Sequence, residues 1–183
     1  MILRILSRSP GHASVSKRLF ANREMAYSEK RVIGFAREQM FDVVADVAQY
    51  HHFVPWCRRS DVLEEHENVR ITELEIGFPP LHESYQSRVI LVRPSVVHSV
   101  VIGDSIFNTL ETTFRFAKDT DHSCVLHYDL VFEFKYSLHS QIAHLFFDKV
   151  VTTMVGAFLH RAETIHGKPT ISHSKAEILR YRN

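Results

Sequence analysis

The sequence predicts an α+β fold: a twisted antiparallel sheet of about six to seven strands wrapped around one long C-terminal helix, with two short helices after the first strand. Residues 57–136 form successive segments in which apolar and polar side chains alternate, as in strands with one face in water. Residues 138–166 carry apolar side chains at intervals of three and four, the helical period. Strands and helices do not alternate along the chain, so an antiparallel sheet is expected.

The first three predicted elements lie between residues 27 and 56. Tyr27 to Phe35 is rich in Val, Ile and aromatic residues and is expected to form the first strand. Arg37 to Val47 changes to a helical period, which predicts the first short helix. Gln49 to Trp56 follows as a second short helix or a turn, which Pro55 ends.

Six further strands are expected before the long helix. Their predicted bounds are Ser60–Glu65, Val69–Phe78, Glu83–Arg93, Val96–Ile102, Asn108–Ala117 and Val125–Tyr136. Proline and glycine residues between several of these segments favour turns. The inward face of the sheet would carry large side chains, which either pack solidly against the helix or leave a tunnel.

The long helix is predicted at Leu138 to His166, because no proline interrupts this segment and Gly167-Lys168-Pro169 supplies stop signals. Two apolar rows run along it: Leu138, Ile142, Leu145, Phe146, Val150, Met154, Ala157 and Phe158 form the first, and Phe147, Val151, Val155 and Leu159 form the second. An amphipathic surface helix has one such row. This helix is therefore either buried on both sides, or covers an apolar cavity on one side and meets a membrane or a partner on the other.

The two ends of the chain differ in composition from the middle. Residues 1–23 contain basic residues and no acidic one, and they can form a short basic amphipathic helix, as in a mitochondrial transit peptide. The alternative is a disordered tail without a targeting role. Residues 167–183 are polar and basic and are expected to form a frayed end or a short extra helix. The predicted organisation is a transit peptide (1–23), one domain (24–166) and a C-terminal tail (167–183).

Composition argues against several classes of function. Without the first 20 residues, 18 basic residues face 21 acidic ones, a net charge of −3, so nucleic acid is not an expected partner. No run of 18 apolar residues occurs, so no transmembrane span is expected. Cys57 and Cys124, the only cysteines, lack CxxC spacing and are expected to be reduced, packed thiols.

The sequence contains no recognisable catalytic or metal-binding motif. Its 13 histidines form no HExxH or Cys/His cluster with the spacing of metal ligands, so no metal site is predicted. It also lacks a nucleophile elbow, a glycine-rich phosphate loop and a dinucleotide-binding fingerprint. We therefore predict no catalytic residues.

One segment carries a more specific signal. Asp46 to Cys57 resembles the D-V-x-x-Y-x-x-F-V-P-W-C signature of the coenzyme Q-binding proteins, which belong to the START-like, polyketide-cyclase superfamily. The resemblance extends over roughly Tyr27 to His166 and implies the helix-grip fold, which has the element order predicted above. The first helix of such families often begins with Ser-Pro-Glu, and this sequence has Ala36-Arg37-Glu38 instead.

The resemblance implies a non-catalytic binding protein or chaperone for ubiquinone at the matrix face of the inner mitochondrial membrane. It would deliver ubiquinone for respiratory electron transport and support its biosynthesis beside the complexes of these pathways, with no cofactor. The quinone ring and its nearest isoprene units would lie between sheet and long helix. The side chains expected to line this cavity are Leu74, Ile76, Val89, Leu91, Phe114, Phe116, Leu130, Phe132, Val150, Met154 and Phe158. Phe53, Val54 and Trp56 are expected at its mouth, in contact with the membrane.

Two other functions stay open at this point. START-like folds also host cyclases and aromatases, so an enzyme acting on a quinone precursor is one alternative. Such an enzyme needs polar groups inside the sheet, and the inward candidates are Thr72, Tyr85, Ser87, Thr112 and Tyr128. The other alternative is a protein-interaction module whose long helix binds a partner such as the ribosome, because bacterial relatives include a ribosome-association toxin.

Overall fold

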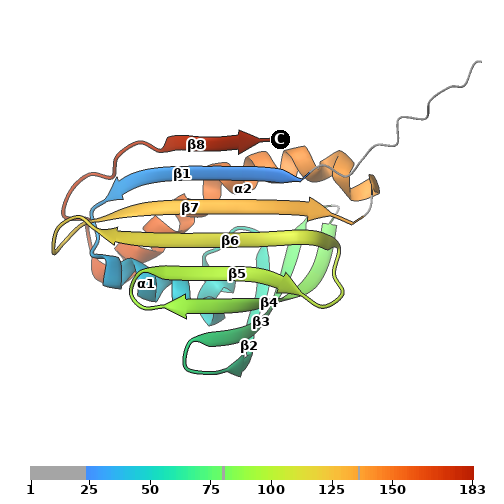
Figure 1. Cartoon of the computed structure of the whole chain (residues 1–183), viewed down its shortest axis with the longest axis horizontal. Helices are drawn as coiled ribbons and strands as arrows, with labels where there is room; N and C mark the ends of the chain where they lie inside the picture. Colours follow the sequence, from blue (N-terminus) through green and yellow to red (C-terminus); the bar gives the residue numbers. More distant parts are fainter. Residues whose placement is uncertain (1–23, 80, 136) are drawn as a thin grey trace, which may run out of the picture.

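The described part of the chain consists of one antiparallel sheet and three helices (Figure 1). The computed structural model describes residues 24–79, 81–135 and 137–183, without the side chains of residues 81 and 137–143. The predicted transit peptide, residues 1–23, lies outside the described residues. In order, the elements are β1 (Met25–Ile33), α1 (Arg37–Ala45), the 3-10 helix η1 (Val47–His52), β2 (Cys57–Glu65), β3 (Val69–Phe78), β4 (Leu81–Val92), β5 (Val96–Ile102), β6 (Phe107–Lys118), β7 (Cys124–Phe134), α2 (Ser137–His166) and β8 (Glu177–Arg182).

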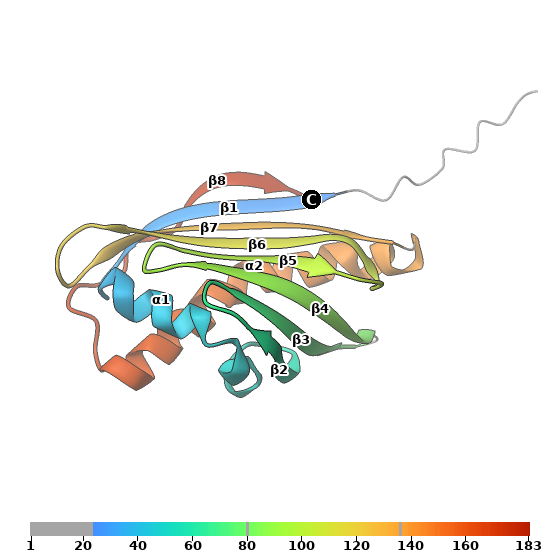
Figure 2. The same cartoon turned by 60° about the horizontal axis from the view of Figure 1, so that its bottom comes forward.

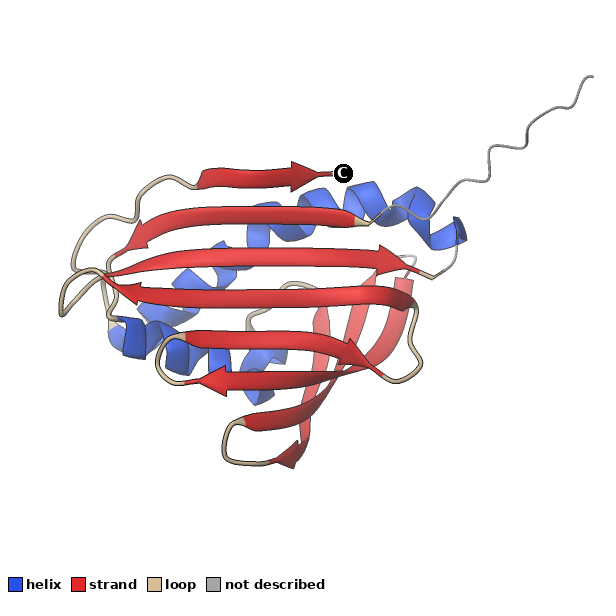
Figure 3. Cartoon of the chain, in the orientation of Figure 1, coloured by secondary structure: helices blue, strands red, loops and turns tan. Residues whose placement is uncertain are grey.

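The strands are arranged in the order β2-β3-β4-β5-β6-β7-β1-β8. β2 to β7 follow one another as an antiparallel meander, and β1 pairs with the last strand of that meander. The sheet curls, so that β2 and β3 turn down towards the helices (Figure 2). α2 crosses the concave face diagonally, with α1 and η1 beside it (Figure 3). These features confirm the predicted fold class.

The sheet has one strand more than the expected six to seven among the described residues, because the C-terminal tail adds β8 at its edge. Glu177–Arg182 pairs with β1, where the sequence predicts a frayed end or a short helix. The β8 sequence Glu-Ile-Leu-Arg-Tyr-Arg has no strict alternation of apolar and polar residues that would predict a strand, and all six residues are exposed. The backbone N–H of Thr170 donates to the Gly34 carbonyl at 2.9 Å and leads the tail towards β1. Glycine is required at position 34, because a Cβ there would lie 2.2 Å from the Ile171 carbonyl oxygen.

The short helices differ most from their predicted bounds. α1 ends at Ala45 because Asp46 has φ −83° and ψ 67°, which is not a helical conformation. The chain then continues as the 3-10 helix Val47–His52 and not as a helix from Gln49. Ala36 has no side chain that can cap α1, and the Gln39 side chain instead accepts a hydrogen bond from the Ala36 N–H at 3.0 Å.

Both apolar rows of α2 are largely buried through its described middle turns, whereas a third face that includes Lys149, Thr152 and His160 is exposed. Its second apolar row packs on the sheet and on β8, with the Phe147 ring 5.7 Å from Phe132 and 5.3 Å from Tyr181. Its first row faces a space between helix and sheet, and Leu145 at the margin of that row is 65% exposed. The side chains of Leu138 and Ile142 lie outside the described residues. None of the helices in the described ranges has the length and apolar character needed to cross a bilayer.

β1 carries a charged residue into the interior of the protein. Glu29 is 1% exposed, and both of its carboxylate oxygens are paired. The Tyr27 hydroxyl donates to one oxygen at 2.6 Å, and the Arg31 guanidinium donates to the other at 2.6–2.7 Å. Burial, together with this hydrogen bond to Glu29, raises the pKa of Tyr27. The cluster offsets the cost of removing a carboxylate from water, so loss of one member leaves the others unsatisfied.

Replacing this buried carboxylate tests how much the cluster contributes to stability. Glu29→Ala should lower the free energy of unfolding by about 3 kcal/mol, because Arg31 and the Tyr27 hydroxyl lose their partner. Asp121→Ala is the matched control, since it removes the exposed ion pair with Lys118 (2.7 Å) and should cost less than about 1 kcal/mol. Urea unfolding of both variants measures the difference, and equal losses would show that burial adds nothing here.

Candidate ligand cavity

A cavity lies between α2 and the inner face of the sheet, bordered by η1 and the start of β2. Its volume is about 130 Å³, measured as the space open to the centres of water molecules. One water needs about 10–15 Å³ by this measure, so the cavity is much larger than a packing defect. β3 to β7 supply one wall, α2 supplies the opposite wall, and most lining residues are apolar.

The structure places most of the predicted lining residues at this cavity. Those that border it are Leu74, Ile76, Val89, Phe114, Leu130, Phe132, Val150, Met154 and Phe158. Leu91 and Phe116 are buried but do not border it. They share the inward faces of β4 and β6 but lie two residues further along each strand, at the end that α1 covers. Alternation along a strand predicts the face of a residue and does not predict what covers that face.

Several lining residues were absent from the sequence-based set. They include Tyr50, Cys57, Val97, Ser99, Phe107 and Leu110. The alternation of β5 contains the signal for Val97 and Ser99, since both lie on one face of that strand. Tyr50 and Cys57 belong to the irregular connection around η1, where no periodic pattern predicts the direction of a side chain.

Hydroxyl groups interrupt the apolar wall formed by β3 to β7. Those that border the cavity belong to Thr72, Tyr85, Ser87, Ser99, Thr112 and Tyr128. All of the polar candidates expected from the sequence are present, and Ser99 is an addition. Thr72 and Ser87 are cross-strand neighbours on β3 and β4, and Ser99 and Thr112 are cross-strand neighbours on β5 and β6.

Most of these hydroxyls have no hydrogen-bond partner among the residues that the structure describes. Within the described ranges only Thr72 has a side-chain hydrogen bond, a long one of 3.5 Å that its hydroxyl donates to the Ser87 carbonyl. Tyr128 and Ser87 are 1% and 2% exposed, so their hydroxyls are buried polar groups without a protein partner among the described residues. Burial raises the pKa of Tyr85 and of Tyr128, so both hydroxyls stay protonated at neutral pH and can donate to a ligand oxygen.

A tight turn, Val54-Pro55-Trp56-Cys57, borders the cavity and contains Val54 and Trp56, two of the residues predicted at its mouth. The Cys57 N–H donates to the Val54 carbonyl at 3.2 Å, and Pro55 occupies the first central position, which fits a type II turn. Trp56, at the second central position, has φ 62°, a conformation that favours glycine. Holding a bulky residue there costs about 1–3 kcal/mol, so contacts of the indole must offset this strain.

Trp56 packs against aromatic residues from two other elements. Its ring centroid lies 5.3 Å from that of Phe78 at the end of β3 and 6.3 Å from that of Phe146 in α2. The Phe78 and Phe146 centroids lie 5.2 Å apart. We call Trp56, Phe78 and Phe146 the mouth triad; Trp56 and Phe146 border the cavity, and Phe78 packs against them without bordering it. Aromatic pairs of this geometry contribute about 0.5–1.5 kcal/mol each, comparable with the strain at Trp56.

Phe53, predicted at the mouth beside Val54 and Trp56, does not border the cavity. Its ring packs 5.7 Å from Tyr50 and 5.3 Å from Phe158, and the Arg161 guanidinium lies 5.5 Å from its centroid. The Tyr50 hydroxyl donates to the Val44 carbonyl at 2.5 Å. Phe53 therefore fastens η1 to the C-terminal half of α2.

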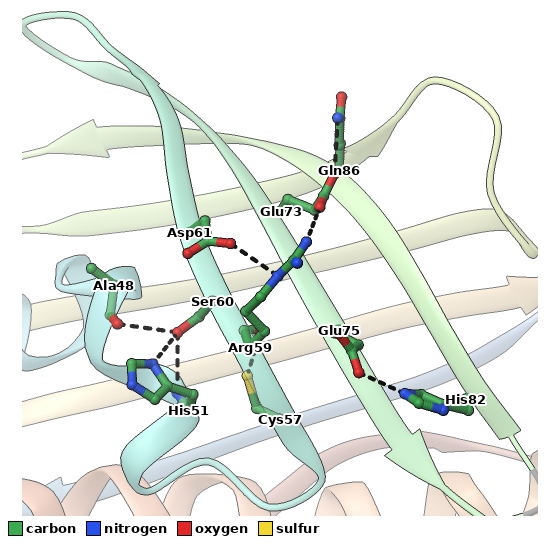
Figure 4. Close-up of polar contacts among 10 residues, drawn as sticks. All are labelled: Ala48, His51, Cys57, Arg59, Ser60, Asp61, Glu73, Glu75, His82 and Gln86. Atoms are coloured by element: carbon green, nitrogen blue, oxygen red, sulfur yellow. Dashed lines mark hydrogen bonds and ion pairs between the residues drawn. The ribbon is translucent and has the colours of Figure 1, made fainter.

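Polar contacts on β2 to β4 hold the strands beside the mouth (Figure 4). Arg59 pairs with Asp61 at 3.0 Å and with Glu73 of the next strand at 2.5 Å. His82 donates to Glu75 at 2.6 Å, and this hydrogen bond lowers the pKa of Glu75. These exposed pairs fix the register of the hairpin more than they add stability.

Ser60 and His51 lie close enough to resemble a nucleophile and its base, but their contacts are structural (Figure 4). The His51 Nδ1 lies 2.9 Å from the Ser60 Oγ, and the backbone N–H of His51 donates to the same oxygen at 3.1 Å. The Ser60 hydroxyl in turn donates to the Ala48 carbonyl at 3.1 Å. Neither side chain borders the cavity, so the pair anchors η1 to β2.

The described lining offers no acid–base pair for catalysis. It contains no carboxylate and no imidazole, and its thiol, Cys57, has its pKa raised to about 11 by burial. Burial also raises the pKa of Cys124, which lies away from the cavity, to about 12. Across the described residues, no group of three His, Cys, Asp or Glu side chains is placed to hold a metal ion. The arrangement suits an apolar ligand that carries oxygen atoms.

Comparison of the fold with known proteins gives consistent matches. Residues 33–159 match the family model described as polyketide cyclase / dehydrase and lipid transport. The Zhui aromatase/cyclase from Streptomyces sp. R1128 superposes with a TM-score of 0.66 at 15% identity, covering 77% of this chain and 94% of that one. The 18 kDa protein CC1736 from Caulobacter crescentus superposes with a TM-score of 0.63 at 22% identity, covering 78% and 99%. At these identities the likeness shows the fold alone.

Sequence relatives are more specific. The mitochondrial coenzyme Q-binding protein COQ10 homolog B of Xenopus laevis is 42% identical over 165 residues, which cover 88% of this chain and 68% of that protein. The mitochondrial coenzyme Q-binding protein COQ10 of Drosophila melanogaster is 37% identical over 171 residues, covering 92% and 71%. The ribosome association toxin RatA of Pseudomonas aeruginosa is 29% identical over 136 residues, covering 74% and 94%. The chain therefore belongs to the COQ10 group of coenzyme Q-binding proteins, within the polyketide cyclase / dehydrase and lipid transport family.

Proposed function

We propose that this chain binds coenzyme Q in the cavity and carries it, as a chaperone, without catalysing a reaction on it. The observation that supports this most is a mostly apolar cavity with buried, unpartnered hydroxyls, in a chain that is 42% identical to a protein named as coenzyme Q-binding. Carrying a ligand requires a wall that excludes water and a way in, and it requires no acid or base. The lining described above has this composition.

The cavity chemistry suits a quinone ring. The carbonyl and methoxy oxygens of the ring only accept hydrogen bonds, and the hydroxyls of Ser99, Thr112 and Tyr128 can donate them. The apolar lining suits the isoprene units. Ligand pockets usually measure about 300–1,000 Å³, and this cavity is about 130 Å³. The ring and its nearest isoprene units are therefore the enclosed part, and the rest of the tail folds or protrudes into lipid.

The cellular setting extends the same proposal. The relatives are named as mitochondrial, and residues 1–23 would act as the transit peptide that brings the chain to the matrix face of the inner membrane. There it would take up and release quinone for respiration and quinone biosynthesis, with no cofactor. Val54 and Trp56 at the mouth, with the exposed Leu145 nearby in α2, are the proposed contacts with the membrane surface.

Organic extraction of the purified chain, followed by mass spectrometry, tests the proposal directly. Ubiquinone near one molecule per chain, either retained from expression or acquired from quinone-loaded vesicles, is the expected result. A chain that stays empty after incubation with such vesicles would contradict it. Conversion of a quinone precursor by the purified chain would support the cyclase alternative, and copurification of ribosomal subunits without lipid would support the interaction module.

The hydroxyl groups in the cavity wall lead to a separate prediction. Thr112→Val keeps the shape of the side chain but removes one donor from the cavity, so the Kd for ubiquinone should rise about fivefold, the value of one net hydrogen bond. Thr113→Val is the matched control, because Thr113 is the next residue on β6 and does not border the cavity. Equilibrium binding of decylubiquinone measures the Kd of both variants. An equal effect of the two substitutions would show that Thr112 does not contact the ligand.

The two cysteines provide an internal test of where the ligand binds. Cys57 borders the cavity and Cys124 does not, although both are buried. Decylubiquinone at ten times its Kd should slow iodoacetamide labelling of Cys57 about tenfold, because the occupied cavity excludes the reagent. Labelling of Cys124 should not change.

The pH dependence checks that the labelled group is the buried thiol. The pKa of Cys57 is raised to about 11, so its thiolate fraction, and therefore its labelling rate, should rise about tenfold from pH 8 to pH 9. Peptide mass spectrometry at timed intervals follows both cysteines. Equal protection of Cys57 and Cys124 would mean that the ligand stabilises the whole fold without filling this cavity.

A further inference from the structure

In the mouth triad, Trp56 is held by ring contacts with Phe78 and Phe146. The Trp56 indole N–H has no hydrogen-bond partner in the described part of the chain, and the ring is only partly buried. The wall at η1 is different, because the Tyr50 hydroxyl donates to the Val44 carbonyl and the Arg161 guanidinium covers Phe53. Trp56 is therefore held at the mouth by ring contacts, whereas the η1 side is also held by a hydrogen bond and a cation.

The backbone under Trp56 is fixed. Its carbonyl accepts a hydrogen bond from the Gly77 N–H at 2.9 Å, and the turn is closed by the Cys57 N–H on the Val54 carbonyl. Movement of the indole is therefore rotation of the side chain, which needs no change in the turn. The backbone conformation favours glycine at this position, so the turn itself gives no reason for a large ring. The role of the Trp56 indole therefore lies in its contacts at the edge of the cavity.

We propose that Trp56 is the gate of the cavity, and that its indole must leave Phe78 and Phe146 before a ligand passes. This inference rests on the proposed function, because it assigns the exit route of the same cavity. The ring contacts that break on opening set the rate of exchange. A gate changes association and dissociation by the same factor, whereas a simple contact residue changes dissociation alone.

Exchange kinetics of the full chain test the proposal. Association and dissociation of decylubiquinone are each followed by rapid filtration at timed intervals, with phosphatidylcholine vesicles as the acceptor. Trp56→Gly suits the turn and removes the ring, so both rate constants should rise about tenfold, equivalent to about 1.4 kcal/mol and consistent with the loss of two ring contacts. Trp56→Phe keeps a ring on the same backbone and should restore most of the slow exchange.

Two further variants keep the outcome interpretable. Phe78→Leu weakens the same triad from β3 and should also speed both steps, which gives a second test if Trp56→Gly does not fold. Phe35→Leu is the control for general loss of core packing, since Phe35 is buried but does not border the cavity, and it should leave both rate constants unchanged.

The possible results separate the gate from the binding function. Wild-type chain that binds no quinone would overturn the proposed function and the gate with it. Normal binding, with exchange that is unchanged in Trp56→Gly and Phe78→Leu, would overturn the gate alone. A rise in dissociation without a matching rise in association would make Trp56 a contact residue and would likewise overturn the gate.

Discussion

The structure depends on how α2 packs into the concave side of a curled sheet. Its second apolar row lies against β7 and the strands at that edge, where Phe147 meets Phe132 and Tyr181. The sheet curls away from this line of contact, so a straight helix cannot touch all of the strands at once. The gap that remains opposite β3 to β7 is the cavity, and η1 with the following turn borders it. The position of the cavity is therefore a consequence of the curvature of the sheet.

An unfilled cavity weakens the fold. At about 24 cal/mol per Å³, 130 Å³ corresponds to about 3 kcal/mol of lost packing. Buried hydroxyls such as those of Ser87 and Tyr128, which have no partner in the described part of the chain, add the cost of unsatisfied polar groups. A larger apolar side chain at one of the hydroxyl positions would reduce both costs. Under the proposed function, a ligand with oxygen atoms on an apolar body would offset both costs when it fills the cavity.

The fold by itself does not select this function. An aromatase/cyclase shares it at 15% identity, and a ribosome association toxin is related to the chain at 29% identity. The described cavity lining of this chain has hydroxyls but contains no carboxylate or imidazole, the groups that acid–base chemistry most often uses. Under the proposed function, this wall would retain and release a ligand, and Trp56 would set the rate of release. In the turn at Trp56, the backbone conformation favours glycine, but the chain has tryptophan there.

The sequence by itself determined the elements and the faces of the strands. Alternation predicted Val69–Phe78, and the turn signals at Pro94 and Gly103 delimited Val96–Ile102, both with the observed bounds. Helical spacing predicted α2, and all of these signals depend only on neighbours along the chain. It did not determine which part of an inward face stays uncovered: Leu91 and Phe116 have the right alternation but lie under α1.

The tertiary structure also determined the conformation and the contacts of the segments without periodicity. β8 is a strand because β1 offers it a free edge, and its exposed residues carry no pattern that shows this. Phe53 and Trp56 are three residues apart in an irregular connection, and only the turn geometry sends Trp56 to the mouth and Phe53 against Phe158. Local sequence determines which kinds of contact a residue can make. The packing of elements that are distant in the chain determines which of these contacts form.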